Sequence, residues 1–106
     1  MTHGIKAAAV ILMAALIAVP AFAQAPGADT YKKCVMCHGA DGLATSTMAK
    51  NMKVLSFKDT AMLKATDAQF IASTTNGKGA HMPAYKDKLT SAQIKDVVAY
   101  IRVLQK

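Results

Sequence analysis

The sequence predicts an all-α fold of three to five short helices, and three observations support this class. Two segments begin with Thr-x-x-Gln, at Thr66 and Thr90, which is typical of the capped start of a helix. The residues after Thr90 place apolar side chains at i, i+3, i+4 and i+7, the period of a helix with one buried face. No stretch alternates apolar and polar residues as a half-buried strand does.

The first helix is expected to begin at an N-cap at Asp29 or Thr30 and to end near His38, where glycines at positions 39 and 42 stop it. Its spacing places four side chains on one face: Tyr31, Cys34, Val35 and His38. The weakly periodic stretch between this helix and Thr66 is expected to be a loop with one or two short helical turns.

A middle helix of about ten residues should follow Thr66 and end at Asn76-Gly77. The last helix should follow Thr90, and its buried stripe should consist of Ile94, Val97, Val98, Ile101 and Leu104. Tyr100 lies just off that stripe, and we expect it to pack against the first helix near Gly27 and Tyr31.

Residues 1–23 are predicted to be a secretory signal peptide, whose removal leaves a single small domain of residues 24–106. Apolar residues run without interruption over positions 7–19, and Ala21-Phe22-Ala23 has the small-x-small form that signal peptidase cuts. A membrane anchor is the alternative, but 13 apolar residues fall short of the roughly 20 that span a bilayer. We therefore expect a periplasmic protein without stable membrane insertion after cleavage.

Cys34-Val35-Met36-Cys37-His38 forms a C-x-x-C-H pentapeptide, the pattern of covalent attachment of a c-type haem. On a helical turn the two cysteines lie on one face, about 5 to 6 Å apart at Cβ, where their thiols can add to the two vinyl groups of a porphyrin. His38 shares that face and is expected to bind the iron. The sequence therefore predicts one haem c, held by two thioether bonds.

Three other chemistries use cysteines at this spacing. A redox dithiol accompanies a βαβ pattern, which this chain lacks. A zinc site needs four nitrogen or sulfur ligands, and Cys34, Cys37 and the remote His81 supply three. A disulfide between the two cysteines would close a very small loop and would stabilise little. Haem attachment also suits a domain this small, because its core is only marginally stable without a disulfide, a metal or a bound cofactor.

The second axial ligand decides the class of function, because a six-coordinate haem suits electron transfer and a five-coordinate haem suits ligand binding or catalysis. The candidates are Met36, Met48, Met52, Met62, Lys78, His81 and Met82. Met36 lies within the proximal motif and cannot reach the other face, and the next three methionines are assigned to packing. Met82 lies in a glycine-containing loop that ends at Pro83, and its neighbour His81 is the main competitor.

Three segments resemble a small bacterial class I c-type cytochrome: residues 34–38, the loop with Gly77-Lys78-Gly79 and Met82-Pro83-Ala84-Tyr85, and the helix over residues 93–101. The resemblance covers almost all of residues 24–106. It implies the cytochrome c fold, in which the helices wrap around one covalently bound haem, and it assigns the axial positions to His38 and Met82. A backbone oxygen within residues 42–44 is expected to accept a hydrogen bond from the His38 ring.

The resemblance implies a soluble monohaem electron carrier between periplasmic or membrane redox partners, acting as a monomer and not as an enzyme. His/Met ligation raises the reduction potential. Two other functions stay open. One is a haem enzyme or ligand sensor, such as a weak peroxidase, with a labile distal ligand. The other is a haem subunit of a larger oxidoreductase.

The charge of the chain suggests the kind of partner. Residues 24–106 carry 12 Lys and Arg against six Asp. Lys78, Lys86 and Lys88 flank the Met82 loop, so we expect a positive rim near the haem edge that attracts redox partners with acidic docking surfaces. Nucleic acid is not an expected partner, because the chain is exported and contains no recognition motif.

Overall fold

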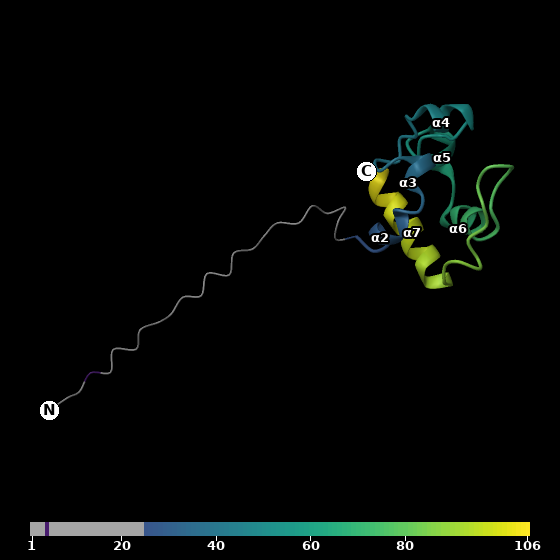
Figure 1. The fold of residues 1–106 in the computed structure, drawn as a ribbon. Helices are drawn as coiled ribbons and strands as arrows, with labels where there is room; N and C mark the ends of the chain where they lie inside the picture. Colours follow the sequence, from purple (N-terminus) through teal and green to yellow (C-terminus); the bar gives the residue numbers. More distant parts are fainter. Residues whose placement is uncertain (1–3, 5–24) are drawn as a thin grey trace.

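The computed structural model describes residue 4 and residues 25–106, so the predicted signal peptide lies, apart from Gly4, outside the described residues. The described part is helical, and its single β-type pairing is an isolated bridge between Lys78 and Met82, which confirms the all-α class. None of its helices is both long and apolar enough to cross a membrane. Figure 1 shows these helices: α2 (Ala28–Tyr31), α3 (Val35–His38), α4 (Thr47–Asn51), α5 (Thr60–Lys64), α6 (Asp67–Asn76) and α7 (Ser91–Leu104).

Both predicted capping boxes are formed, and they fix the starts of the two longest helices. At α6 the Thr66 hydroxyl oxygen accepts from the Gln69 N–H at 3.1 Å, and Gln69 Oε1 accepts from the Thr66 N–H at 2.8 Å. Thr90 and Gln93 make the same pair of bonds at α7. Helix α6 has 10 residues and ends before Gly77, as predicted.

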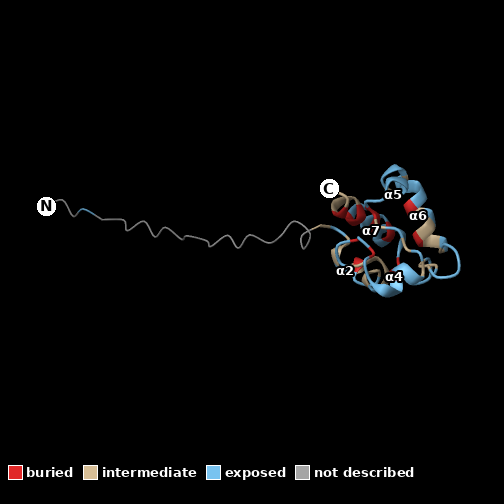
Figure 2. Ribbon diagram, turned by 90° about the horizontal axis from the view of Figure 1, so that it is seen from above, coloured by how far each residue is buried: buried red, intermediate tan, exposed pale blue. Residues whose placement is uncertain are grey.

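Helix α7 contributes more buried residues than any other described helix, and Figure 2 shows them in red. It packs against α2 and against α6, which places it between the two chain segments that flank the site. Its predicted apolar stripe is buried in full. The core cluster consists of Tyr31, Phe57, Phe70, Val97, Val98, Tyr100, Ile101 and Leu104.

The contact between α2 and α7 is a close backbone approach at Gly27. This residue has a φ of +84°, and a Cβ there would overlap the Asp96 carbonyl group and lie 2.7 Å from the Val97 nitrogen. Beside it, the rings of Tyr31 and Tyr100 pack with centroids 5.0 Å apart and a tilt of 52°. The predicted packing of Tyr100 on the first helical segment is therefore confirmed.

The first helix differs from the prediction because it is divided into α2 and α3, and its N-cap is Gly27 rather than Asp29 or Thr30. Between the two parts, the N–H groups of residues 32–34 bond to the carbonyls three residues earlier, at 2.8 to 3.2 Å. Such bonds tighten the chain into a 3₁₀-like turn. The division raises the number of helices in the described residues to six, against the three to five expected.

The stretch before α6 contains the short helices α4 and α5, as predicted for a loop with one or two helical turns. Ser46 and Asp59 cap them, because their side-chain oxygens accept from the N–H groups of Ala49 and Ala61 at 3.0 Å. Met48 on α4 is 45% exposed, so the expectation that it packs in the interior is wrong. The buried residue of α4 is its neighbour Ala49, which turns the Met48 side chain outward.

The close approach at Gly27 predicts a large penalty for Gly27→Ala. The added methyl group would force α2 away from the Asp96 carbonyl, and the substitution should cost about 3 kcal/mol of unfolding free energy. Gly79→Ala is the matched control, because Gly79 also has a positive φ, +62°, but no atom lies within 4 Å of its added Cβ. The control should lose only about 1 to 2 kcal/mol. Denaturant midpoints of the two variants measure the difference, and equal losses would contradict the proposed contact.

Candidate functional site

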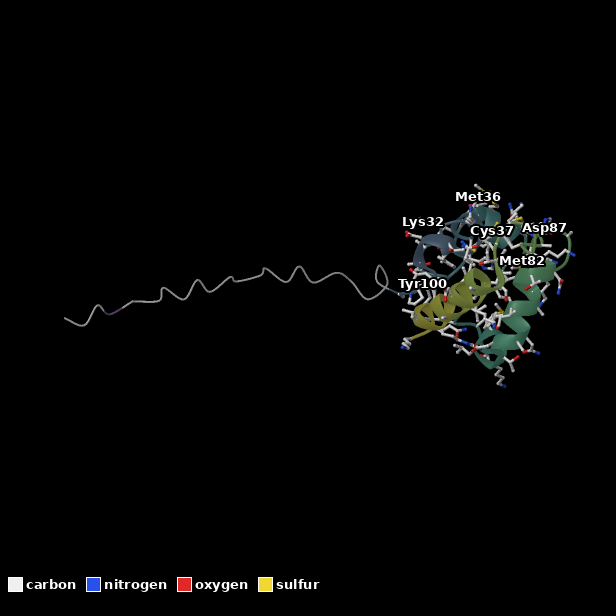
Figure 3. All side chains as sticks on the ribbon, turned by 90° about the horizontal axis from the view of Figure 1, so that it is seen from below. Lys32, Met36, Cys37, Met82, Asp87 and Tyr100 are labelled. Carbon is white, nitrogen blue, oxygen red and sulfur yellow. The ribbon has the colours of Figure 1, made fainter. Side chains whose placement is uncertain are left out.

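A cavity of about 1040 Å³ lies between α3, the segment from α4 to α6 and the loop that follows α6. This volume matches the upper end of the range for ligand and cofactor cavities, about 300 to 1,000 Å³. Cys34, Cys37 and His38 line the cavity from the α3 side, and Met82 lines it from the loop. Figure 3 labels Cys37 and Met82, which come from these separate segments. The structure thus brings all four predicted cofactor-binding residues to the lining of one cavity, three from the α3 side and one from the loop.

The α3 side is held by short-range backbone bonds. The His38 N–H donates to the Cys34 carbonyl at 3.0 Å, and the Gly39 N–H donates to Val35 at 2.8 Å, so both cysteines and the histidine belong to one helical turn. The hydroxyl of Tyr31 donates to the Gly39 carbonyl at 2.6 Å and ties this turn to the core. Burial, with a smaller contribution from Cys37, raises the pKa of Cys34 to about 11, so this free thiol is protonated at neutral pH.

The His38 ring is packed against the ring of Phe57. The two centroids are 4.8 Å apart and the planes differ by 14°, which is a stacked arrangement. Burial lowers the pKa of His38, because a low dielectric disfavours the charged imidazolium. The ring is therefore neutral at neutral pH, and the neutral imidazole is the form that binds metals.

The expected hydrogen bond from the His38 ring to residues 42–44 is not made. The His38 Nδ1 atom is buried and has no hydrogen-bond partner among the described residues. The Gly42 carbonyl instead accepts the N–H of Phe57 at 2.9 Å. Ala44 contacts the same turn differently, because its N–H donates to the backbone carbonyl of His38 at 3.0 Å.

The loop that carries Met82 is closed by its own backbone. The Lys78 N–H donates to the Met82 carbonyl at 3.0 Å, and the Met82 N–H donates to the Lys78 carbonyl at 3.3 Å. The far end returns to α6, where the Tyr85 N–H donates to the Thr74 carbonyl at 3.0 Å. Gly77 permits this return, because a Cβ there would lie 2.7 Å from the Met82 carbonyl oxygen. These bonds fix the position of residue 82 relative to α6.

His81 and Lys78, the other candidate ligands in this loop, also line the cavity. Both are exposed, whereas Met82 is half-buried. Of the remaining candidates, Met52 and Met62 line the cavity wall, in keeping with the packing role expected for them, and Met36 is 73% exposed.

Phe57 and Tyr85 both line the cavity, and sequence reasoning gave neither of them a specific role there. Burial raises the pKa of Tyr85, and the nearby thiols of Cys34 and Cys37 raise it further, so the phenol lies close to the α3 motif. Phe57 stands in a stretch without clear periodicity, 19 positions after His38, and no local pattern indicates that the two rings meet.

The donor set suits a covalently attached haem. The cavity lining carries two free thiols and one neutral imidazole on the α3 side and one thioether on the loop, while most of the lining residues between α4 and α6 are apolar. Within residues 25–106 the structure forms no group of three or more His, Cys, Asp or Glu side chains that could hold a metal ion by themselves. Two thiols, an imidazole and a thioether are the side chains that would hold a c-type haem and its iron.

The fold and this cavity define a c-type cytochrome, and the comparison with known families agrees. The family described as "Cytochrome C oxidase, cbb3-type, subunit III" matches residues 22–101. The chain belongs to this family of small class I c-type cytochromes. Membership confirms the predicted class and implies haem c as the cofactor and electron transfer as the general function.

The chain is also similar to individual c-type cytochromes and cytochrome subunits. It is 36% identical over 82 residues to cytochrome c6 of Leptolyngbya boryana. This match covers 74% of this chain and 88% of that protein. It is 34% identical over 87 residues to the cytochrome c subunit of alcohol dehydrogenase (quinone) from Gluconacetobacter polyoxogenes, and there the match spans 76% of this chain but only 19% of the subunit. The solved structure of the KustC0563 c-type cytochrome superposes with a TM-score of 0.68 at 26% identity, covering 77% of this chain and 99% of that one.

Proposed function

We propose that this chain is an exported monohaem electron carrier that shuttles single electrons between periplasmic or membrane redox partners. The observation that carries the proposal is the cavity of about 1040 Å³, which has the C-x-x-C-H motif on one segment and Met82 on another. The similarity to cytochrome c6 along 88% of that protein's length supports a small free-standing carrier.

Each residue of the site has a distinct role in this proposal. Cys34 and Cys37 hold one haem through two thioether bonds, and His38 and Met82 occupy the two axial positions of its iron. When bound, haem supplies one-electron chemistry by cycling between ferric and ferrous iron. The apolar residues on the wall, such as Val54, exclude water from the iron ligands. With both axial positions taken by side chains, no coordination site is left for a substrate, so we propose no enzymatic activity.

A role within a larger complex is the second candidate. The similarity to a cytochrome c subunit of alcohol dehydrogenase (quinone) favours it, although the matched region is 19% of that subunit. The same four residues would then pass electrons inside an assembly rather than between separate proteins. We favour the free carrier and propose a monomer, because the cytochrome c6 relative is matched along most of its length.

Export and processing are part of the proposal. Residues 1–23 are proposed to be a signal peptide that is removed, and residues 24–106 to be the cytochrome c domain in the periplasm. The family match supports this division, because it begins at residue 22 and therefore omits the whole apolar run over residues 7–19.

The proposed partners carry acidic docking surfaces. Four exposed lysines line the cavity: Lys33, Lys53, Lys64 and Lys78. Lys88 lies near its rim, because its ammonium group lies 5.7 Å from the ring centroid of Tyr85, which lines the cavity. Positive charge around the opening attracts an acidic patch and speeds encounter.

Covalent attachment predicts that haem stays with the polypeptide in acid-acetone extraction of the exported protein. Cys34→Ser and Cys37→Ser should each reduce the yield of haem-loaded protein, because one thioether bond is lost, and the double variant should release all remaining haem. Extracted and retained haem are measured by pyridine haemochrome spectra. Free extraction from the unaltered protein would show that the motif does not bind haem covalently.

Axial ligation by Met82 predicts that Met82→Ala abolishes the sulfur-to-iron charge-transfer band of the ferric protein and lowers its reduction potential. The variant should also bind carbon monoxide readily in the ferrous state, because its distal position is open. His81→Ala is the matched control from the same loop and should keep the band. If His81→Ala loses low-spin ligation while Met82→Ala keeps its spectrum, His81 is the ligand. Ready carbon monoxide binding by the unaltered protein would favour the sensor or enzyme instead.

The lysine rim predicts that the second-order rate of electron exchange with an acidic redox protein falls about tenfold as ionic strength rises from about 10 mM to about 300 mM. Lys78→Glu should lower the rate at low ionic strength, because Lys78 lines the cavity. Lys95→Glu changes the total charge equally but lies on α7, outside the cavity lining, and should have the smaller effect. Stopped-flow kinetics measure the salt dependence and the rates of the two variants. A rate that does not change with ionic strength would show that the lysines are an ordinary solvated surface.

A further inference from the structure

The His38 ring lacks the contact that usually orients a metal-binding imidazole. Such a histidine normally donates its second ring nitrogen to a carbonyl, carboxylate or water, which fixes the plane of the ring. The buried Nδ1 of His38 has no such partner among the described residues. The flat face of Phe57 is packed against the ring instead.

We propose that Phe57 is a positioning residue for His38, and that this ring stack sets the angle at which the imidazole plane meets the haem. The proposal rests on the function proposed above, in which His38 binds the iron. Phe57 touches neither iron nor substrate in this scheme, because it acts only through His38.

The geometry of the stack explains how a hydrocarbon ring can orient the imidazole. The centroid distance of 4.8 Å lies within the range of about 4.5 to 7 Å preferred by aromatic pairs, and the 14° angle leaves the planes nearly parallel. Rotation of the imidazole about its Cβ–Cγ bond would drive a ring edge into Phe57. One face of the imidazole is therefore blocked by a surface that favours a parallel arrangement.

Phe57 can do this because its own position is fixed from both sides of its backbone. Its N–H donates to the Gly42 carbonyl at 2.9 Å, and its carbonyl accepts from Gln105 Nε2 at 2.9 Å. A Cβ at Gly42 would lie 2.7 Å from Phe57 Cδ2, so the glycine permits the ring to lie against this loop. The Phe70 ring meets the Phe57 ring edge-on, with the two ring centroids 6.2 Å apart and the ring planes at 84°. The residue is 3% exposed.

The support for Phe57 extends into α7 and α6. The Gln105 side chain also accepts from Arg102 Nη1 at 2.8 Å. Arg102 in turn donates to Asp67 Oδ1 at 2.8 Å and to the Ala65 carbonyl at 2.6 Å, and its guanidinium lies 4.7 Å from the Phe70 ring centroid. Phe57 is thus connected to the end of the longest helix and to the start of α6, and it provides a stable surface for the imidazole.

The plane of an axial imidazole has direct spectroscopic consequences. It determines which iron d orbital overlaps the imidazole π system, and this overlap controls the spread of the ferric electron paramagnetic resonance g-values and the pattern of haem methyl proton shifts. A residue that only fills the core would alter stability and leave both signatures in place. These measurements therefore separate positioning from packing.

The test compares Phe57→Leu with Val98→Ala in the haem-loaded protein. Leucine keeps an apolar side chain at position 57 but offers no flat face, so the g-values should shift, the lines should broaden and the haem methyl pattern should change. The charge-transfer band from the methionine ligand should persist. Val98 is a buried core residue of α7 that does not line the cavity, so Val98→Ala should lose stability without these spectroscopic changes.

Two further variants keep the test decisive. Phe57→Tyr retains the ring and should restore the g-values of the unaltered protein. Gln105→Ala removes one backbone anchor of Phe57 and should shift the g-values in the same direction as Phe57→Leu by a smaller amount. If Phe57→Leu yields no haem-loaded protein, Gln105→Ala decides, and unchanged g-values in it overturn the proposal.

The outcomes also separate this inference from the proposed function. Unchanged g-values and haem methyl shifts in Phe57→Leu, together with a loss of stability like that of Val98→Ala, would show that Phe57 is a core residue only, while the proposed function would stand. If the unaltered protein gives no low-spin ferric signal, both this inference and the proposed function are overturned, because His38 would then not share the iron with a second strong ligand.

Discussion

The close approach of α2 to α7 at Gly27 is the constraint on which the rest of the described domain depends. It brings the two ends of the domain into backbone contact, and the pair of Tyr31 and Tyr100 then packs beside it. Because the Tyr31 hydroxyl holds the Gly39 carbonyl, the same contact fixes the turn that carries both cysteines and His38. Helix α7 also packs against α6, so one helix sets the separation of the two sides of the cavity.

The parts of this structure that the sequence predicts well are those specified by residues close together in the chain. A capping box needs only Thr and Gln three positions apart, and both boxes form where predicted. The C-x-x-C-H spacing likewise brings its side chains to one helical turn without help from the rest of the fold. The buried stripe of α7 follows from a single period, and all five of its residues are buried.

The parts that could not be predicted depend on contacts between distant segments. A backbone oxygen near residues 42–44 was expected to bond the His38 ring. The carbonyl of Gly42 instead accepts the N–H of Phe57, and only the path of the chain after α4 brings that N–H there. Exposure of Met48 has the same origin, since α4 packs against α3 and buries Ala49, which turns the neighbouring Met48 to solvent. Division of the first helix could not be predicted either, because no residue pattern in this sequence indicates the run of three 3₁₀-like hydrogen bonds.

The two backbone hydrogen bonds between Lys78 and Met82 hold the shape of the loop without involving its side chains. They use only main-chain atoms and enclose three exposed residues, of which Ala80 and His81 carry side chains. Replacing the side chains at these two positions leaves both bonds available, so the loop tip can acquire new charges or shapes while the sulfur beside it stays where it is. Evolution, or a designer, can thus alter which partners this face recognises without moving the residue proposed to ligate the iron.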